Sequence, residues 1–267
     1  MKIRSLIGVA AALFCGSAAA ADAADSPTLA QIRHRGELRV GLEAGYMPFE
    51  MLDKSGQLIG FDIDLARLMA RKLGVKLSIV NQGWDGIIPA LLTGKFDVTL
   101  GGMTITPERA KSVDFCDPYL TIGQTVLLSR KLAGTVTRAE QLNAPEYRVL
   151  SKLGTTGEIA ARKHFSRAQI RTFEHQADAA IEVRNGRADA FVYDLPFNAV
   201  MAAQFPDSLV HLKEPFTRED LGWAIRKNDP ALRAWLNEFL ASLKKDGTYQ
   251  ALYKKWFEGS AWLPNVI

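Results

Sequence analysis

Arg109 is a positively charged residue at a predicted helix start, where a positive charge is unfavourable unless an anion lies nearby. Thr106 and Pro107 are typical of the first residues of a helix, so Arg109 falls in the first turn. The helix dipole disfavours a cation there, whereas a guanidinium can hold a carboxylate through two parallel hydrogen bonds. Arg109 is therefore a candidate clamp for a carboxylate, and the alternative is a surface pair with Glu108 or Asp114.

Two glycine-containing loops could bring bare backbone close to a ligand. Gly101 and Gly102 follow a predicted strand, and glycine allows close approach to the chain. Residues 154–158, Gly-Thr-Thr-Gly-Glu, follow another strand and begin a helix, where free N–H groups can bind an anion. A plain strand-to-helix turn with a capping threonine explains the second loop equally well.

Three further residues could complete a site for a small zwitterion. Asp194 ends a predicted strand and precedes a Leu-Pro pair, so it either caps the next helix or serves as counter-ion to an ammonium group. Tyr46 and Trp84 lie in predicted loops. Aromatic rings in such loops either pack locally or form the walls of a ligand slot.

The elements that would position these groups alternate between strands and helices from Glu37 onward, which predicts an α/β architecture with mainly parallel sheets. The pattern predicts strands over 38–40, 75–80, 96–100, 148–150 and 190–193, helices over 63–73, 87–92 and 248–257, and a helix that begins at Asp229-Pro230 and ends at Gly247. A helix, glycine, basic residue and strand occur in this order at Gly94 and again at Gly186. This repeat is consistent with two lobes of similar construction.

Composition excludes several classes of function. A length of 267 residues corresponds to about two domains at ~150 residues each, and 48% hydrophobic with 23% charged residues is typical of a globular protein. The net charge of +4 is small and the basic residues are dispersed, so we expect no nucleic-acid partner. The four histidines are scattered, and the common hydrolase, dinucleotide and Walker A motifs are missing from the sequence. We therefore expect neither a metal nor a cofactor.

The first 23 residues are predicted to be a signal peptide. A short basic segment precedes an apolar stretch over residues 6–14, and an alanine-rich tract offers cleavage between residues 20 and 24. The apolar stretch is shorter than the ~20 residues that span a bilayer. Cys15 follows the bulky Phe14, which argues against lipidation, and Cys116 is predicted to be a buried, unpaired cysteine.

Five segments together resemble the periplasmic solute-binding proteins of polar amino acid ABC transporters. They span residues 41–49, 60–65, 84–89, 104–109 and 246–249, in the order and spacing of that family. The resemblance implies a type II periplasmic-binding-protein fold with two α/β lobes, two hinge crossovers near residues 121–126 and 216–221, and an interlobe ligand cleft. It places residues 24–121 and 217–267 in lobe 1 and residues 122–216 in lobe 2.

The resemblance also implies a role for each candidate site residue. Arg109 would hold the α-carboxylate, together with the regions of Thr104 and Thr156. The α-ammonium would be received by the Gly102 carbonyl, the Thr104 hydroxyl and Asp194. Tyr46 and Trp84 would enclose the side chain of the ligand, and Glu43 and Lys152 would select it. Gly101 stands where basic-amino-acid binders often have serine. Tyr193 stands where the glutamine binder has histidine.

An acid and a base at the side-chain end favour a neutral polar ligand, with glutamine first. Lys152 would repel a cationic side chain and Glu43 an anionic one, whereas an amide can bond to both. The alternative is that Glu43 and Lys152 pair with each other, which would leave Tyr46 and Trp84 to bind an apolar or aromatic ligand.

The predicted function is that of a monomeric, non-catalytic periplasmic protein that binds a polar L-amino acid and delivers it to the permease of an ABC transporter. A basic or apolar amino acid is an alternative ligand. Another alternative is a cyclohexadienyl dehydratase, an enzyme that resembles this family but places a glutamate three residues after the equivalent of Asp194. This chain has Phe197 there, which cannot donate a proton. A sensor domain, whose chain would continue into a transmembrane helix, is a third alternative.

Overall fold

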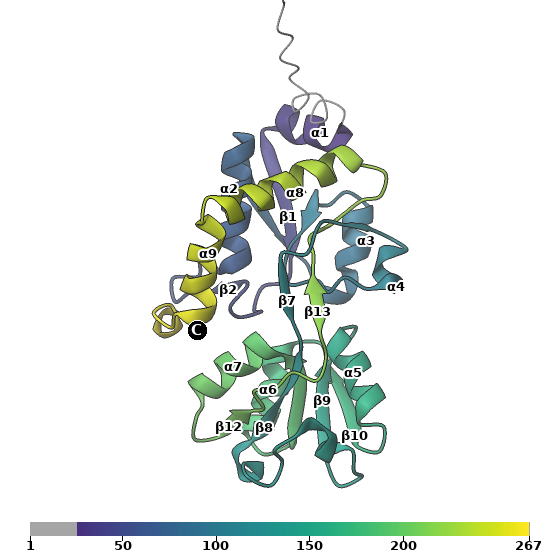
Figure 1. The fold of residues 1–267 in the computed structure, drawn as a ribbon, viewed down its shortest axis with the longest axis vertical. Helices are drawn as coiled ribbons and strands as arrows, with labels where there is room; N and C mark the ends of the chain where they lie inside the picture. Colours follow the sequence, from purple (N-terminus) through teal and green to yellow (C-terminus); the bar gives the residue numbers. More distant parts are fainter. Residues whose placement is uncertain (1–25, 267) are drawn as a thin grey trace, which may run out of the picture.

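The computed structural model describes residues 26–266, so the predicted signal peptide lies outside the described residues (Figure 1). Two five-stranded sheets occupy opposite ends of the molecule. The first has the order β4-β1-β5-β14-β6 and the second has the order β10-β9-β11-β8-β12. We call the unit around the first sheet lobe 1 and the unit around the second lobe 2.

The strands are β1 (Glu37–Leu42), β2 (Met51–Leu52), β3 (Leu58–Ile59), β4 (Lys76–Asn81), β5 (Val98–Thr99), β6 (Asp114–Phe115), β7 (Leu120–Ile122), β8 (Gln124–Ser129), β9 (Arg148–Lys152), β10 (Gln169–Phe173), β11 (Ala190–Asp194), β12 (Leu209–His211), β13 (Glu219–Leu221) and β14 (Ala224–Ile225). The α-helices are α1 (Pro27–Arg35), α2 (Phe61–Leu73), α3 (Ile87–Leu92), α4 (Pro107–Ala110), α5 (Thr156–His164), α6 (Gln176–Arg184), α7 (Leu195–Gln204), α8 (Pro230–Lys245) and α9 (Thr248–Tyr253).

Both sheets are mixed, and the prediction of mainly parallel sheets is wrong, because two of the four strand pairings in each sheet are antiparallel. The two parallel pairings in each sheet bring strand ends to the same edge. In lobe 1, β1 pairs in parallel with β4 and β5. In lobe 2, β9 pairs in parallel with β10 and β11. The carboxyl ends of these strands face the other lobe, as the contact between Lys152 at the end of β9 and Glu43 just after β1 shows. Ligands of open α/β sheets bind beyond this edge.

Helix α2 illustrates how the sequence specifies an element of lobe 1. Phe61, Leu65 and Met69 recur at helical spacing and are buried in the core. The helix begins two residues before the predicted start, directly after Gly60. Gly60 adopts φ 139°, and a Cβ there would lie 2.1 Å from the carbonyl oxygen of Phe49, so this position requires glycine. The helix ends at the predicted position, where Gly74 adopts φ 70°.

Two predicted elements are shorter in the structure. Residues 96–100 are predicted as a strand because they are apolar, but only Val98–Thr99 pair with neighbouring strands. Residues 248–257 are predicted as one helix, whereas α9 ends at Tyr253 and a π-helical turn follows over Lys254–Glu258. The predicted cap of α8 is confirmed, because the Asp229 side chain accepts a hydrogen bond from the backbone of Leu232 at 3.0 Å.

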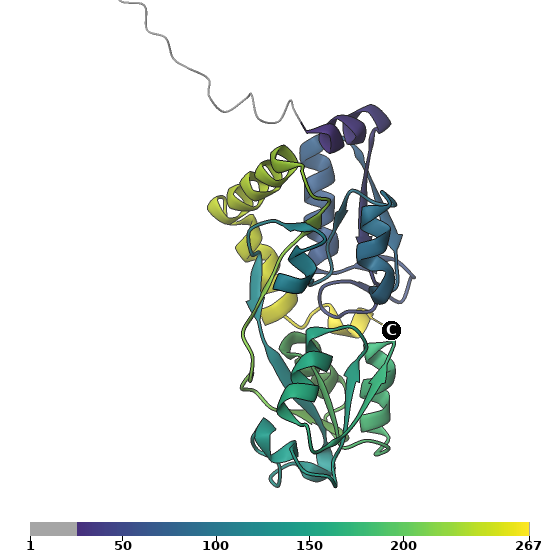
Figure 2. The same ribbon diagram turned by 90° about the vertical axis from the view of Figure 1, so that its right-hand side faces the viewer.

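Two antiparallel strands, β7 and β13, run side by side between the lobes at the positions where the crossovers are predicted (Figures 1 and 2). Thr121 of β7 donates to Asp220 of β13 at 2.6 Å. Just beyond β7, a Cβ at Gly123 would lie 2.1 Å from the carbonyl oxygen of Thr217. The two chain segments therefore pass between the lobes as one closely packed ribbon.

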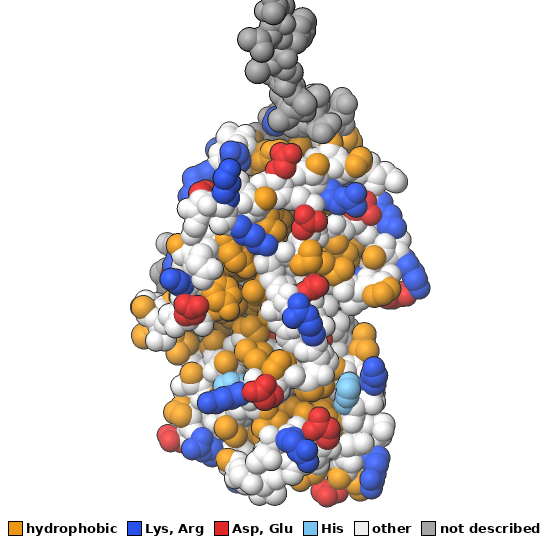
Figure 3. Space-filling model, viewed as in Figure 1, with side chains coloured by type: hydrophobic (Ala, Val, Ile, Leu, Met, Phe, Trp, Pro, Cys, Tyr) orange, Lys and Arg blue, Asp and Glu red, His pale blue; other side chains and the backbone are white. Residues whose placement is uncertain are grey.

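Hydrophobic side chains gather on the face where the lobes meet (Figure 3). A groove of about 610 Å³ at this junction is lined by residues of both lobes, including Leu120, Pro196, Val200 and Phe257. Cys116 is buried as predicted, and burial raises the pKa of its thiol to about 12. Within residues 26–266, no helix has the length and apolar character needed to cross a membrane.

Candidate functional site

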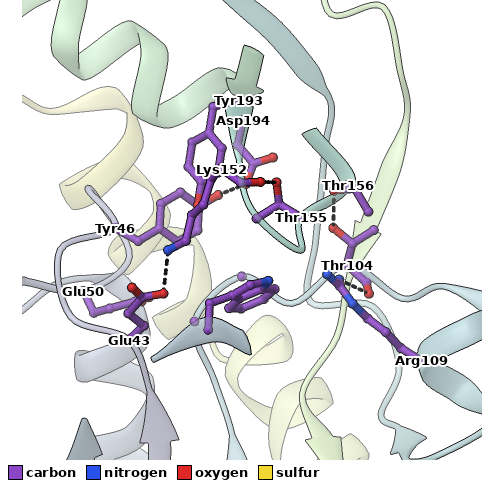
Figure 4. A pocket seen from close by; sticks show the side chains of 13 residues that line it. Glu43, Tyr46, Glu50, Thr104, Arg109, Lys152, Thr155, Thr156, Tyr193 and Asp194 are labelled. Carbon is purple, nitrogen blue, oxygen red and sulfur yellow. Dashed lines mark hydrogen bonds and ion pairs between the residues drawn. The ribbon is translucent and has the colours of Figure 1, made fainter. Parts of the chain in front are cut away.

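The ten predicted site residues all line one cavity between the lobes (Figure 4). The complete lining consists of Glu43, Tyr46, Glu50, Trp84, Gly101, Gly102, Thr104, Arg109, Lys152, Thr155, Thr156, Tyr193 and Asp194. The first eight of these come from lobe 1 and the last five from lobe 2. Glu50, Thr155 and Tyr193 line the cavity as well, although they are not among the predicted ligand-binding residues.

Arg109 occupies the first turn of α4, as predicted. Its backbone N–H is capped by the Thr106 hydroxyl at 3.2 Å. The guanidinium donates to the carbonyl oxygens of Thr104 at 2.9 Å and Gly154 at 3.4 Å, and it lies 5.1 Å from the centre of the Trp84 ring. Among the residues of the described chain, Arg109 forms no ion pair within 4 Å, so the predicted alternative of a surface pair is wrong.

Burial lowers the pKa of Arg109, and the nearby carboxyl groups of Asp194 and Glu219 oppose this effect. The guanidinium is thus poorly solvated, and its hydrogen-bond acceptors within residues 26–266 are neutral carbonyl oxygens. Such an arrangement favours the arrival of an anion, which would form stronger, charge-assisted hydrogen bonds.

Asp194, the last residue of β11, directs its carboxylate into the cavity and not toward α7. Asp194 is the N-cap residue of α7, as the alternative predicts, but its side chain forms no capping hydrogen bond within the described residues. The carboxylate accepts hydrogen bonds from the Tyr46 hydroxyl and from Gln124 Nε2. Burial raises the pKa of Asp194 to about 7, although the hydrogen bond from Tyr46 lowers it. An ammonium group placed here would relieve the cost of this buried charge.

Glu43 and Lys152 form an ion pair across the cleft at 2.5 Å, the arrangement that the sequence analysis left as an alternative. Lys152 also donates to Gln176 Oε1 at 2.7 Å, and His175 Nδ1 lies 3.3 Å from Glu43 Oε1. Only 3% of the Lys152 side chain and 11% of the Glu43 side chain are exposed. The lysine therefore already has two partners in this closed arrangement.

Glu219 is a site residue that the sequence analysis missed. Its Oε2 accepts hydrogen bonds from the hydroxyls of Thr104 at 3.0 Å and Thr156 at 2.6 Å, and from Gln124 Nε2 at 3.3 Å. Glu219 belongs to β13, and Gln124 begins β8 just after β7. Both residues lie in the predicted crossovers, which pass directly behind the cleft. Their polar side chains in these segments could therefore have identified them as site residues from the sequence.

A buried carboxylate holds the glycine loop of lobe 1 in place. Asp62 Oδ2 accepts from the backbone N–H of Gly101 at 2.7 Å, the N–H of Gly102 at 3.2 Å and the Tyr119 hydroxyl at 3.0 Å. Burial raises the pKa of Asp62 to about 7, and these hydrogen bonds oppose the rise. A Cβ at Gly102 would lie 2.4 Å from the Tyr46 ring, so the bare backbone here is required by packing.

Tyr46 and Trp84 take different parts in the cavity. Tyr46 is buried, stacks on Phe49 at 4.5 Å and turns its hydroxyl to Asp194. Trp84 is partly exposed and donates from Nε1 to the Gly154 carbonyl oxygen at 3.1 Å. Both therefore form bonds from lobe 1 to lobe 2, and both rings line the cavity as predicted.

The lobes are closed over the cavity. Hydrogen bonds and ion pairs that cross the cleft join Tyr46 to Asp194, Trp84 to Gly154, and Lys152 to Glu43. The side chains leave a free volume of about 20 Å³, which is room for about one water molecule. A larger ligand can therefore enter only when the lobes part, and the contact of Tyr46 with Asp194 must give way to it.

Two further observations concern metal-ligating side chains and position 197. No group of three or more His, Cys, Asp or Glu side chains within residues 26–266 could hold a metal ion. Phe197 is fully buried, packs in lobe 2 against Phe191 and Tyr193, and is not itself one of the residues that line the cavity.

Two α/β lobes, joined by two crossovers and closed over buried charges of both signs, define a binding protein with the type II periplasmic-binding-protein fold. The sequence pattern of the bacterial extracellular solute-binding proteins, family 3, matches residues 38–259, and the chain belongs to this family. The predicted resemblance is confirmed.

Relatives and solved structures extend this similarity over most of the chain. The chain is 33% identical over 254 residues to the L-cystine-binding protein TcyJ of Escherichia coli (strain K12), with 95% of each chain covered. It is 50% identical to a binding component of an ABC transporter from Wolinella succinogenes DSM 1740, solved in complex with lysine, with a TM-score of 0.83 and coverage of 86% and 99%. It is 53% identical to the ancestral amino acid-binding protein AncCDT-1, a precursor of cyclohexadienyl dehydratase, with a TM-score of 0.79 and the same coverage.

Proposed function

We propose that this protein binds a polar L-amino acid in the periplasm and delivers it to the permease of an ABC transporter. The observation that carries the proposal is that Arg109 of lobe 1 and Asp194 of lobe 2 line the same cavity. A free amino acid carries a carboxylate and an ammonium group on the same carbon atom. A cation and an anion in one closed cleft match this pair of charges.

The α-carboxylate would be bound by Arg109. Its present acceptors, the carbonyl oxygens of Thr104 and Gly154, are neutral, so a carboxylate would be the stronger partner. The first turn of α5, which Thr155 caps, lies beside the guanidinium and offers further N–H donors. The hydrogen bond from Arg109 to the Gly154 carbonyl oxygen, which joins the lobes, would thereby be replaced by two contacts of the ligand carboxylate, one with Arg109 and one with the first turn of α5.

The α-ammonium would be bound by Asp194, with the Thr104 hydroxyl and the Gly102 carbonyl oxygen as further acceptors. All three residues line the cavity. The Tyr46 hydroxyl, which now donates to Asp194, would move aside when the ammonium arrives. Asp194 comes from lobe 2, whereas Thr104 and Gly102 come from lobe 1, so an ammonium bound to all three would hold the lobes together.

Two kinds of side chain suit the remaining end of the cavity. The sequence favours glutamine, because its amide could bond to both Lys152 and Glu43. The ion pair between these residues favours a second candidate, a basic side chain, because Lys152 is already neutralised and would not repel it strongly. The lysine complex of the Wolinella succinogenes protein supports this second candidate.

The relatives support binding over catalysis, since TcyJ and AncCDT-1 are both named as binding proteins. The dehydratase alternative would need a proton donor at position 197, where this chain has a buried phenylalanine. Incubation with prephenate or arogenate, followed by mass spectrometry, tests the point, and conversion of either compound would contradict the proposal.

A calorimetric screen of the twenty amino acids against refolded, ligand-free protein tests the proposed function directly. We expect saturable binding of at least one of glutamine, arginine and lysine at one site per chain. D-enantiomers should bind far more weakly, because Arg109, Asp194 and the residues around the ligand side chain together fix three substituents of the α-carbon. A protein that binds none of the twenty would contradict the proposal.

Ligand binding is expected to compact the protein in solution. A ligand cannot enter the closed cavity of about 20 Å³, so the unliganded lobes must open, and the ligand then holds them closed. Small-angle scattering should show a smaller radius of gyration at saturating ligand than without ligand. An unchanged radius would contradict closure as the response to the ligand.

A further inference from the structure

Glu50 is a buried carboxyl group that the binding of the α-carboxylate and α-ammonium leaves unused. It lines the cavity, and only 1% of the residue is exposed. Its Oε2 has no hydrogen-bond partner within residues 26–266. Buried polar atoms are nearly always hydrogen-bonded, so an unpartnered oxygen at a cavity wall needs an explanation. A donor group supplied by the ligand is one.

The backbone of Glu50 is held firmly, which fixes where the side chain begins. Its N–H donates to the Tyr46 carbonyl oxygen at 2.9 Å, and its own carbonyl oxygen accepts from Gly45 at 3.0 Å. The side chain passes beside Gly101, where an added Cβ would lie 2.9 Å from Glu50 Oε1. Glycine at position 101 therefore leaves the space that the Glu50 carboxyl occupies.

The charges around Glu50 do not balance without a ligand. Glu43, from the loop after β1, and Lys152, from β9, neutralise each other at 2.5 Å. Asp62 of α2 also acts on Glu50, but it is already bonded to the two glycine N–H groups. Lys152 is the cation of the described chain that acts on Glu50, and it is already paired with Glu43, so an ionised Glu50 would be a surplus negative charge at this end of the cavity.

We propose that Glu50 is a specificity-determining residue, whose carboxylate pairs with the cationic end of a bound basic amino acid. The inference rests on the proposed function and deepens it, because it assigns the ligand to arginine and lysine over glutamine. Two cations and two carboxylates would then share this end of the cavity, Lys152 and the ligand side chain with Glu43 and Glu50. A bound glutamine would leave the Glu50 charge unpaired, unless Glu50 held a proton.

Burial raises the pKa of Glu50 well above its usual value; Asp62 and Glu43 add to the rise and Lys152 opposes it. The phenols of Tyr119 and Tyr193 also lie near Glu50. A basic ligand therefore competes with a proton at Glu50. Its binding releases that proton to solvent, whereas glutamine binding does not, so the affinity ratio of arginine to glutamine should increase as the pH is raised.

The test compares wild type with Glu50→Gln, which removes the charge at nearly constant volume, and with Glu140→Gln on the exposed surface of lobe 2 as control. Calorimetry on each protein measures arginine, lysine and glutamine. We expect Glu50→Gln to weaken arginine and lysine by about tenfold or more, because it removes a buried ionic partner. Glutamine affinity should stay within about threefold, and the control should match wild type.

A second measurement needs no variant. Arginine binding to wild type, measured in buffers of different ionisation enthalpy, should release protons, and glutamine binding should release fewer. Equal losses for all three ligands in Glu50→Gln, or equal proton release for arginine and glutamine, would overturn the role of Glu50. A wild type that binds glutamine but neither basic amino acid would overturn this inference alone, whereas a wild type that binds no amino acid would contradict the proposed function itself.

Discussion

Replacing Arg109 with alanine is expected to lower affinity for the amino-acid ligand by a factor of about 30 to several thousand. Truncation of one partner of a buried, hydrogen-bonded charge pair costs about 2–5 kcal/mol, which corresponds to this range. In Arg109→Ala the ligand carboxylate would still lose its water on closure but would find no cation. Calorimetry with the best ligand of the wild-type protein measures the loss.

Two further variants make this result specific. Arg109→Lys should recover little affinity, because an ammonium cannot form the two parallel hydrogen bonds of a guanidinium. Lys111→Ala, close by on the exposed surface, removes an equal charge and a pair with Glu108, and it should bind as wild type does. If Arg109→Ala or Arg109→Lys bound within threefold of wild type, Arg109 would not be the carboxylate clamp.

The second large effect is expected at Asp194. Asp194→Asn keeps the size of the side chain and an acceptor for the Tyr46 hydroxyl, but it removes the negative charge that would face the α-ammonium. We expect a loss of affinity of about 30-fold or more, again from a buried charge left without its partner. Asp178→Asn, at an exposed position on α6, is the matched control. Near-normal binding by Asp194→Asn would place the ammonium elsewhere.

The pH dependence gives an independent check on Asp194. Its pKa is raised, mainly by burial, to about 7 in the unliganded protein. A proton on Asp194 therefore competes with the ligand ammonium, and the affinity of wild type for glutamine, whose binding leaves the Glu50 proton in place, should fall by about tenfold per pH unit below that value. The unliganded protein should respond in the opposite sense, because protonation of an acid with a raised pKa stabilises the folded state. In Asp194→Asn, the pH dependence of affinity and that of folding stability should both lose the part that comes from Asp194. The part that comes from Asp62 should be the same in wild type and in this variant.

The site residues that local sequence could reveal are those that begin or end an element. Arg109 follows the Thr-Pro start of α4, and Asp194 ends a buried strand just before a Leu-Pro pair. Parallel strands present their carboxyl ends at one edge, so residues just after several strands had to lie near one another. Strand ends alone do not show that two such sheet edges face each other. The order and spacing of the resembling segments predicted this arrangement.

Residues whose role depends on distant partners could not be predicted in this way. Glu219 and Gln124 meet through contacts that span 95 positions of the chain, and nothing near either residue indicates the other. The pair of Lys152 with Glu43 spans 109 positions, and its formation decides whether the lysine is free for a ligand. Glu50 directly follows the resembling segment 41–49, which ends in Pro-Phe, but the burial of its Oε2 without a hydrogen-bond partner in the described chain is visible only in three dimensions.

The position of β14 has a consequence for the order in which the lobes can form during synthesis. In the sheet of lobe 1, β14 lies between β5 and β6, although it follows all of lobe 2 in the sequence. A ribosome releases the chain from its N-terminus, so every strand of lobe 2 emerges before the strand that joins the two parts of the lobe 1 sheet. Lobe 2 can therefore complete its sheet first, while the edges of β5 and β6 remain unpaired until β14 has been synthesised.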